Sequence, residues 1–190
     1  MKSLNRLGGR SVSLPLSADD IVEFHAARLL LLISVCGVAA RIDGLTKMAK
    51  LDFFARYPDF FEVARTAIAP AGPGAEARTD ETDLAIESAM VRHHYGPWDK
   101  RYYHVLAQLE AKRLIKVEKD KNAYRLTLTD LGKERAKALA AKPSFAPLIE
   151  RMRQVKKTFG SKSGSFLKDL IYRLFDEEVG QQRMGQVIRR

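Results

Sequence analysis

The sequence predicts a mainly helical chain of the α+β class that carries a small β-hairpin or sheet. Apolar residues recur at three- and four-residue spacing through most of its 190 residues, which is typical of amphipathic helices. The spacing changes between residues 114 and 128, where two short runs are typical of strands. A helix, a two-stranded hairpin and a second helix follow one another there. We therefore predict a winged helix-turn-helix with additional N- and C-terminal helices.

The first helix of this predicted unit covers residues 100–112. Gly96 and Pro97 interrupt the backbone before it, and the carboxylate of Asp99 can accept hydrogen bonds from the free amides of the first helical turn. Its expected buried face consists of aromatic and aliphatic side chains at helical spacing. These are Tyr102, Val105, Leu106 and Leu109.

The hairpin and a closing helix come next. Residues 114–117 and 124–128 are expected to form strands on either side of a polar turn at 120–122. The hydroxyl of Thr129 can cap a helix over residues 130–141. Because an isolated hairpin is only marginally stable, we expect it to pack against the flanking helices.

A third strand and the domain boundaries complete the predicted fold. Residues 87–94 alternate loosely and are expected to pair with the hairpin, although residues 84–91 also fit a helix. A segment rich in Pro and Gly, with no large apolar residue, divides the chain. The predicted regions are an N-terminal helical region (1–68), a linker (69–80), a winged-helix domain (81–142) and a C-terminal helical extension (143–190).

The N-terminal region begins with a helix over residues 18–40, in which residues 29–39 are apolar on almost every side, as is typical of a core helix or a dimer interface. A turn at 41–44 leads to a second helix over 47–57, which Pro58 ends. A helix pair with a basic outer face is the outline of a helix-turn-helix that contacts DNA, and it is equally typical of ordinary helix packing. The basic residues expected on this outer face are Lys47, Lys50 and Arg56.

Composition favours an anionic partner and a reducing compartment. The formal net charge is +10, the pI is near 9.8, and the excess of positive charge lies from residue 100 onward. Cys36 is the only cysteine and lies in an apolar run, so no internal disulfide can form and a buried thiol is expected. That run is too short to span a bilayer, and the N-terminus has no signal-peptide pattern. We expect a cytoplasmic protein with no membrane partner.

The sequence contains no pattern typical of catalysis. Residues 160–163 resemble the end of a phosphate-binding loop but lack its earlier glycine and its adjacent Gly-Lys pair. His93 and His94 have no cysteine or carboxylate partner at metal-ligand spacing, and no nucleophile elbow occurs. We therefore expect no enzyme activity, no catalytic residue, no metal and no cofactor, which leaves binding as the remaining chemistry.

The first candidate binding surface is the basic face of helix 100–112 together with the hairpin turn. Lys and Arg can neutralise phosphates there, while His and Gln can reach base edges. A solvated basic face or a protein-docking face explains the same residues, and Glu118 and Asp120 weaken the argument at the turn. The candidate DNA-binding residues are Lys100, Arg101, His104, Gln108, Lys112, Lys119, Lys121 and Arg125.

The second candidate surface is an apolar stripe on a short helix near the C-terminus. A small protein that works alone does not need such a stripe, so we expect it to bind a partner. The candidate partner-binding residues are Phe166, Leu167, Leu170, Ile171, Leu174 and Phe175.

Three stretches carry a family resemblance. Tyr-Gly-Pro-Trp-Asp-Lys-Arg-Tyr-Tyr at 95–103 leads on to residue 118, Tyr-Arg-Leu-Thr-Leu-Thr-Asp-Leu-Gly-Lys follows at 124–133, and Gly-Leu-Thr-Lys-Met-Ala-Lys-Leu-Asp-Phe-Phe-Ala-Arg-Tyr-Pro precedes them at 44–58. Together they cover less than half of the chain. They resemble the middle component of bacterial ABC-three-component defence systems, the group that includes Lamassu.

The resemblance implies a small non-catalytic adaptor that joins an SMC-like ABC ATPase to an effector subunit, often nuclease-like, in antiviral or anti-plasmid defence. Double-stranded DNA is a further candidate ligand. The alternative, from the residues alone, is a dimeric winged-helix transcriptional regulator. In that reading residues 18–40 form the dimer helix and residues 100–112 enter the major groove.

Overall fold

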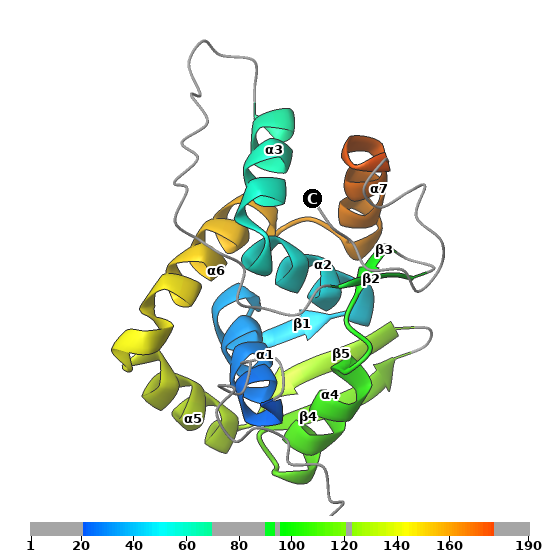
Figure 1. The fold of residues 1–190 in the computed structure, drawn as a ribbon. Coiled ribbons are helices and arrows are strands. Elements are labelled where there is room, and N and C mark those ends of the chain that lie inside the picture. The colour runs from blue at the N-terminus through cyan, green and yellow to red at the C-terminus, as the bar shows by residue number, and fades with distance from the viewer. Residues whose placement is uncertain (1–20, 70–89, 94–95, 121–122, 177–190) are drawn as a thin grey trace, which may run out of the picture.

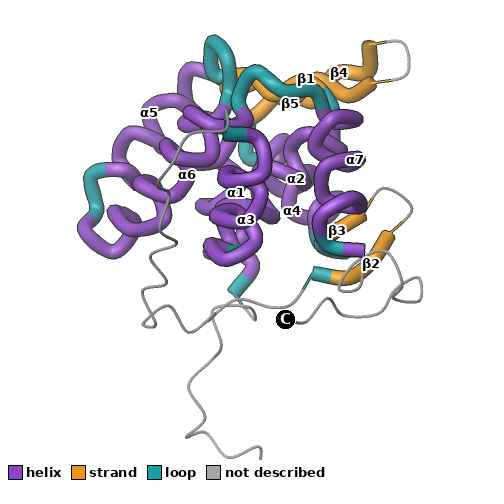
Figure 2. Tube along the Cα trace, turned by 90° about the horizontal axis from the view of Figure 1, so that it is seen from above, coloured by secondary structure: helices purple, strands orange, loops and turns teal. Residues whose placement is uncertain are grey.

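The computed structural model describes residues 21–69, 90–93, 96–120 and 123–176 (Figure 1). These residues confirm the predicted α+β class, because they are mainly helical and include a small three-stranded antiparallel sheet. Helices surround α1 (Val22–Cys36), and the sheet lies along one side of them (Figures 1 and 2). None of the helices in these ranges is long and apolar enough to cross a membrane. The others described are α2 (Leu45–Arg56), α3 (Pro58–Ile68), α4 (Tyr102–Ala111), α5 (Asp130–Ala140), α6 (Ala146–Phe159) and α7 (Gly164–Leu174), with a 3-10 turn at Pro143–Phe145.

The three-stranded sheet joins segments that are far apart in the sequence. Its strands are β1 (Arg41–Asp43), β5 (Ala123–Leu128) and β4 (Ile115–Asp120), in that spatial order. Ile42 lies opposite Leu126, and both side chains are buried. The prediction of a turn at 41–44 is therefore wrong for β1, because three residues are too few for a strand alternation to show in the sequence.

The prediction that residues 87–94 supply the third strand is also wrong. Within that segment the structure describes β2 (Val91–His93), which pairs with β3 (Gly96–Trp98) in a separate two-stranded sheet, while residues 87–89 and 94 lie outside the described residues. The edge of β5 that was available to a third strand is taken by β1. Strands from the predicted N-terminal region and from the predicted winged-helix domain thus share one sheet.

The centre of the core is α1. Its residues 29–33 are at most 1% exposed, and the helix packs against α2, α4, α5 and α6. Cys36 ends the helix with a buried thiol, as the sequence predicts, and its Sγ donates to the carbonyl oxygen of Met152 on α6 at 3.3 Å. Burial raises the pKa of this thiol to about 12, so it stays protonated and unreactive. Residues 29–33 of α1 are therefore covered by the helices of the same chain.

The apolar stripe of α7 is part of the same core. Leu167, Leu170 and Ile171 are at most 2% exposed, and the helix packs against α2, α3 and β3. Phe175 meets Phe60 of α3 edge to face, with ring centroids 4.7 Å apart. The prediction that this stripe binds a partner is therefore wrong for these buried residues; Leu174 is half-buried and Phe166 is 38% exposed. An apolar stripe indicates burial, but it does not indicate which chain provides the cover.

Hydrogen bonds of the Thr129 side chain fix the connection between the hairpin and α5. The Thr129 hydroxyl accepts from the Gly132 amide at 3.0 Å and donates to the Arg113 carbonyl at 2.7 Å, which confirms the predicted cap of α5. A Cβ at Gly132 would lie 1.9 Å from the carbonyl oxygen of Leu114, so only glycine allows α5 to approach this closely. The predicted buried face of α4 is confirmed, since its four residues are at most 5% exposed.

Candidate functional site

A buried network of charged side chains fixes the position of α4. Arg28 of α1 binds Asp52 of α2 through both carboxylate oxygens, with Nε–Oδ1 at 3.0 Å and Nη2–Oδ2 at 3.3 Å. The Tyr102 hydroxyl, at the start of α4, donates to Asp52 Oδ2 at 2.7 Å. Burial raises the pKa of Tyr102 well above its usual value, and the Asp52 charge adds to this effect, so the hydroxyl remains a donor. Three helices therefore meet at one carboxylate.

The same network holds the residue that precedes α4. Asp99 Oδ2 lies 3.1 Å from Arg56 Nη1 and 2.9 Å from Arg101 Nη2. Asp99 Oδ1 accepts from the Arg101 backbone amide at 2.9 Å, but Arg101 is the N-cap residue of α4 and no side chain caps this helix, so the prediction that Asp99 caps it is wrong. Burial alone would raise the pKa of Asp99, but the hydrogen bonds from Arg101 and the nearby guanidinium charges hold it well below its usual range. Asp99 is therefore ionised and holds α4 in place through its guanidinium partners.

Two residues predicted on an outer basic face are in fact inside. Lys50 and Arg56 of α2 are 0% and 4% exposed, so the prediction that they belong to a DNA-contacting surface is wrong. Lys47, the third residue of that predicted face, is half-buried, and its Nζ donates to the Gly160 carbonyl at 2.7 Å. Lys50 Nζ donates to the Pro97 carbonyl at 2.9 Å. Burial, with a smaller contribution from the charge of Lys168, lowers the pKa of Lys50 to about 7. The buried network is the feature that sequence reasoning missed; its signal was a charged residue at nearly every turn of an otherwise apolar α2.

The candidate DNA-binding residues of helix 100–112 are divided among three environments. Lys100 and His104 are exposed on the outer face, together with Tyr103, which is 61% exposed. Arg101 is bound to Asp99 in the network. Gln108 and Lys112 instead line a groove on the flank of α4. The structure thus leaves a smaller outer face than the sequence predicted.

The hairpin contributes little free positive charge in the residues that the structure describes. Lys119 is exposed at the end of β4. Arg125 binds Asp120 at 2.7 Å and Asp43 at 3.4 Å, which leaves its charge largely compensated. Lys121 lies outside the described residues.

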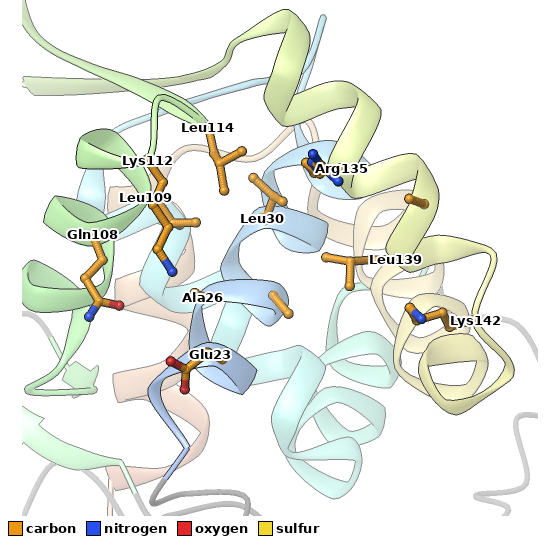
Figure 3. A pocket seen from close by; sticks show the side chains of 12 residues that line it. Glu23, Ala26, Leu30, Gln108, Leu109, Lys112, Leu114, Arg135, Leu139 and Lys142 are labelled. Carbon is orange, nitrogen blue, oxygen red and sulfur yellow. The ribbon is translucent and has the colours of Figure 1, made fainter.

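The groove lies between α1, α4 and α5 and has a volume of about 340 Å³ (Figure 3). Its base is apolar, with Ala26 and Leu30 from α1 and Leu109 from α4. Leu114 and Leu139 close its sides. Figure 3 shows charged side chains around it, from α1 at one end and from α4 and α5 on opposite sides. Glu23, Lys112, Arg135 and Lys142 are these residues.

The titratable groups of the core are paired with one another or kept in one protonation state by burial. The buried carboxylates are occupied by guanidinium and hydroxyl partners, and the Cys36 thiol is protonated. Within the residues that the structure describes, no group of three or more His, Cys, Asp or Glu side chains could hold a metal ion.

Comparisons with protein-family models, with curated proteins and with solved structures find no match.

Replacing Asp52 by Asn should destabilise the protein severely. The change leaves the Arg28 guanidinium buried without its main counter-charge, and breaking a buried ion pair in this way costs about 3–5 kcal/mol. Urea unfolding followed by circular dichroism measures the loss. The matched control is Asp43→Asn, which removes an exposed carboxylate from two arginines and should cost less than about 1 kcal/mol. Equal losses for the two variants would contradict the assigned role of the network.

Lys50 should make stability depend on pH between about 7 and 10. Its folded pKa of about 7 lies below the usual lysine pKa of 10.5, so in this range the unfolded chain binds more protons than the folded chain. Stability therefore rises with pH across the window, and the destabilising effect of Lys50 is complete below about pH 7.

Urea unfolding of the wild type and of Lys50→Met, from pH 6 to pH 10, tests this effect. The stability of the wild type should rise relative to the variant by a few kcal/mol, at about 1.4 kcal/mol per unit of pKa difference. Lys47→Met, on the same helix, is the control; it retains Lys50, so its stability should still rise with pH. Parallel curves for wild type and Lys50→Met would show that Lys50 is not desolvated.

Proposed function

We propose that the chain is a non-catalytic winged-helix adaptor subunit of a prokaryotic defence complex, which links an SMC-like ABC ATPase to an effector subunit and contacts double-stranded DNA. The observation that supports the winged-helix part most is the order of elements. Helix, strand and helix (α1, β1, α2) precede α4 and the β4–β5 hairpin, and β1 pairs with β5. In this reading α4 is the recognition helix, the hairpin is the wing, and α3 with the β2–β3 pair is an insertion.

The sequence resemblance supports the choice of complex. Two of the stretches that carry it, residues 44–58 and 95–118, contain Asp52 and Tyr102, which hydrogen-bond to each other at 2.7 Å. The resemblance therefore rests on segments that pack together rather than on separate local patterns. ATPase and effector remain partners that the resemblance suggests, and the α7 stripe is not part of the proposed interface because it is buried.

The alternative function, a dimeric transcriptional regulator, is less well supported by the structure. It requires α1 to present an apolar face to a second copy, whereas residues 29–33 of α1 are at most 1% exposed in a single chain. An adaptor needs only surfaces that remain open, and among the described residues these include the exposed side of α4, the hairpin and the groove beside α4. A cytoplasmic location follows from this proposal, as both DNA and the ATPase would be found there.

Affinity purification of the tagged chain from its own host, at mild salt and with mass spectrometry, tests the adaptor function. We expect a long coiled-coil ATPase and a second, effector-like subunit at near-equal amount to the chain. Recovery of the chain alone, or of a homodimer with a defined promoter fragment, would contradict the adaptor function and favour the dimeric transcriptional regulator.

Substitution of Lys100 tests the contact with DNA. Fluorescence anisotropy with a labelled duplex should show weaker binding by Lys100→Ala, and the slope of log affinity against log salt should fall by about 1, because one phosphate contact is lost. Lys157→Ala, which removes an exposed lysine from α6, is the matched control and should bind as the wild type does. If the slope of log affinity against log salt is the same for the wild type and both variants, the proposal that α4 contacts DNA is contradicted.

A further inference from the structure

The groove between α1, α4 and α5 is an open apolar surface next to the proposed recognition helix (Figure 3). Its base is formed by Leu30 and Leu109, which are 1% exposed and belong to the core of the chain. Leu139 and Leu114 stand at its sides and are half-buried. The base is therefore a fixed part of the fold, while the sides remain accessible to another molecule.

The edge of the groove is positively charged. Lys112 of α4, Arg135 of α5 and Lys142 beyond α5 are exposed, and Glu23 is the acidic residue among those that line it. Within the described residues, none of the three cations forms an ion pair, in contrast to Lys133 and Lys116, which bind neighbouring carboxylates. These charges are therefore available to an occupant of the groove.

We propose that this groove binds an acidic amphipathic segment of a partner protein. Apolar side chains at helical spacing on the segment fill the base, and its carboxylates meet Lys112, Arg135 and Lys142. The proposal deepens the adaptor function and rests on it for the source of the segment, namely one of the two partner subunits.

The shape of the groove selects this class of partner. A small-molecule site encloses most of its ligand, whereas this groove is open along one side and would cover only one face of an occupant. A phosphate backbone would pair with the cations but would leave the half-buried side chains of Leu114 and Leu139 in contact with water. A helix with one apolar face and flanking carboxylates satisfies both the apolar lining and the charged edge.

The two proposed surfaces of α4 are compatible with each other. Lys100, which precedes the helix, and His104 are exposed to solvent, while Gln108 and the C-cap residue Lys112 line the groove. A partner segment in the groove would therefore lie beside DNA bound to the outer face, and it would not need to displace it.

Site-specific photo-cross-linking in the host tests the proposal. A photo-reactive amino acid replaces Ala138, an exposed residue that lines the groove, and mass spectrometry identifies the peptide that it captures. We expect a segment of another protein that carries net negative charge and apolar residues at three- and four-residue spacing. Capture of this chain's own terminus, of a second copy, of nucleic acid, or of a segment without that pattern would overturn the proposal.

Charge reversal provides the second readout. Lys112→Glu combined with Lys142→Glu should lower the cross-linking yield at least tenfold, because the carboxylates of the segment would then be repelled. Lys157→Glu combined with Arg173→Glu, exposed residues in the last turns of α6 and α7, is the matched control and should leave the yield unchanged. All four residues are exposed and lie at the C-terminal ends of helices, so charge reversal should cost both variants a similar and small amount of stability, which urea unfolding measures. A yield that does not respond to charge reversal in the groove would also overturn the proposal.

Co-purification separates this proposal from the adaptor function. If the ATPase and effector are recovered equally with the groove variant and with the control, the groove proposal fails and the adaptor function stands. If the captured segment has the expected pattern but affinity purification of the wild type recovers neither subunit, the groove proposal stands and the adaptor function fails.

Discussion

The buried contacts among Arg28, Asp52, Arg56 and Asp99 are the constraint on which the rest of the structure depends. Removing charges from water costs several kcal/mol per ion unless each is paired with good geometry. Here the partners come from α1, α2 and the residue that precedes α4, so each helix supplies charges that the others must neutralise. A shift of any one helix would leave a charge buried and unpaired. The network therefore specifies how the helices are arranged more than it adds to their stability.

This constraint determines what α4 can present to other molecules. Its inner face is occupied by the core, and its first residue, Tyr102, is held by Asp52. The outer face and the flank toward α5 are the parts that remain open. One helix thus carries two surfaces of different chemistry, a polar one with Lys100 and His104 and an apolar one with a cationic edge. This arrangement suits a protein whose role is to hold other molecules together.

Local patterns in the sequence predicted the helices, the hairpin, the buried face of α4 and the cap at Thr129, because each depends on residues within a few positions of one another. The features that were missed depend on distant partners. Lys50 and Arg56 were expected outside, since the carbonyl and the carboxylate that bind them lie 47 and 43 residues away. The stripe of α7 was assigned to a partner because a pattern of apolar residues cannot identify the surface that covers it. The groove could not be predicted, because it exists only where three helices meet.

The pairing of β1 with β5 also bears on the order of events during synthesis. Arg41 and Thr127 are opposite each other in the sheet although most of the proposed winged helix lies between them in sequence. Contacts of such long sequence separation form late and slowly, because a large loop must close before they stabilise anything. Because α5, α6 and α7 also pack on α1 or α2, these two helices expose apolar surface as the chain emerges from the ribosome until it has been made as far as α7. Until then this intermediate is open to aggregation and to chaperones.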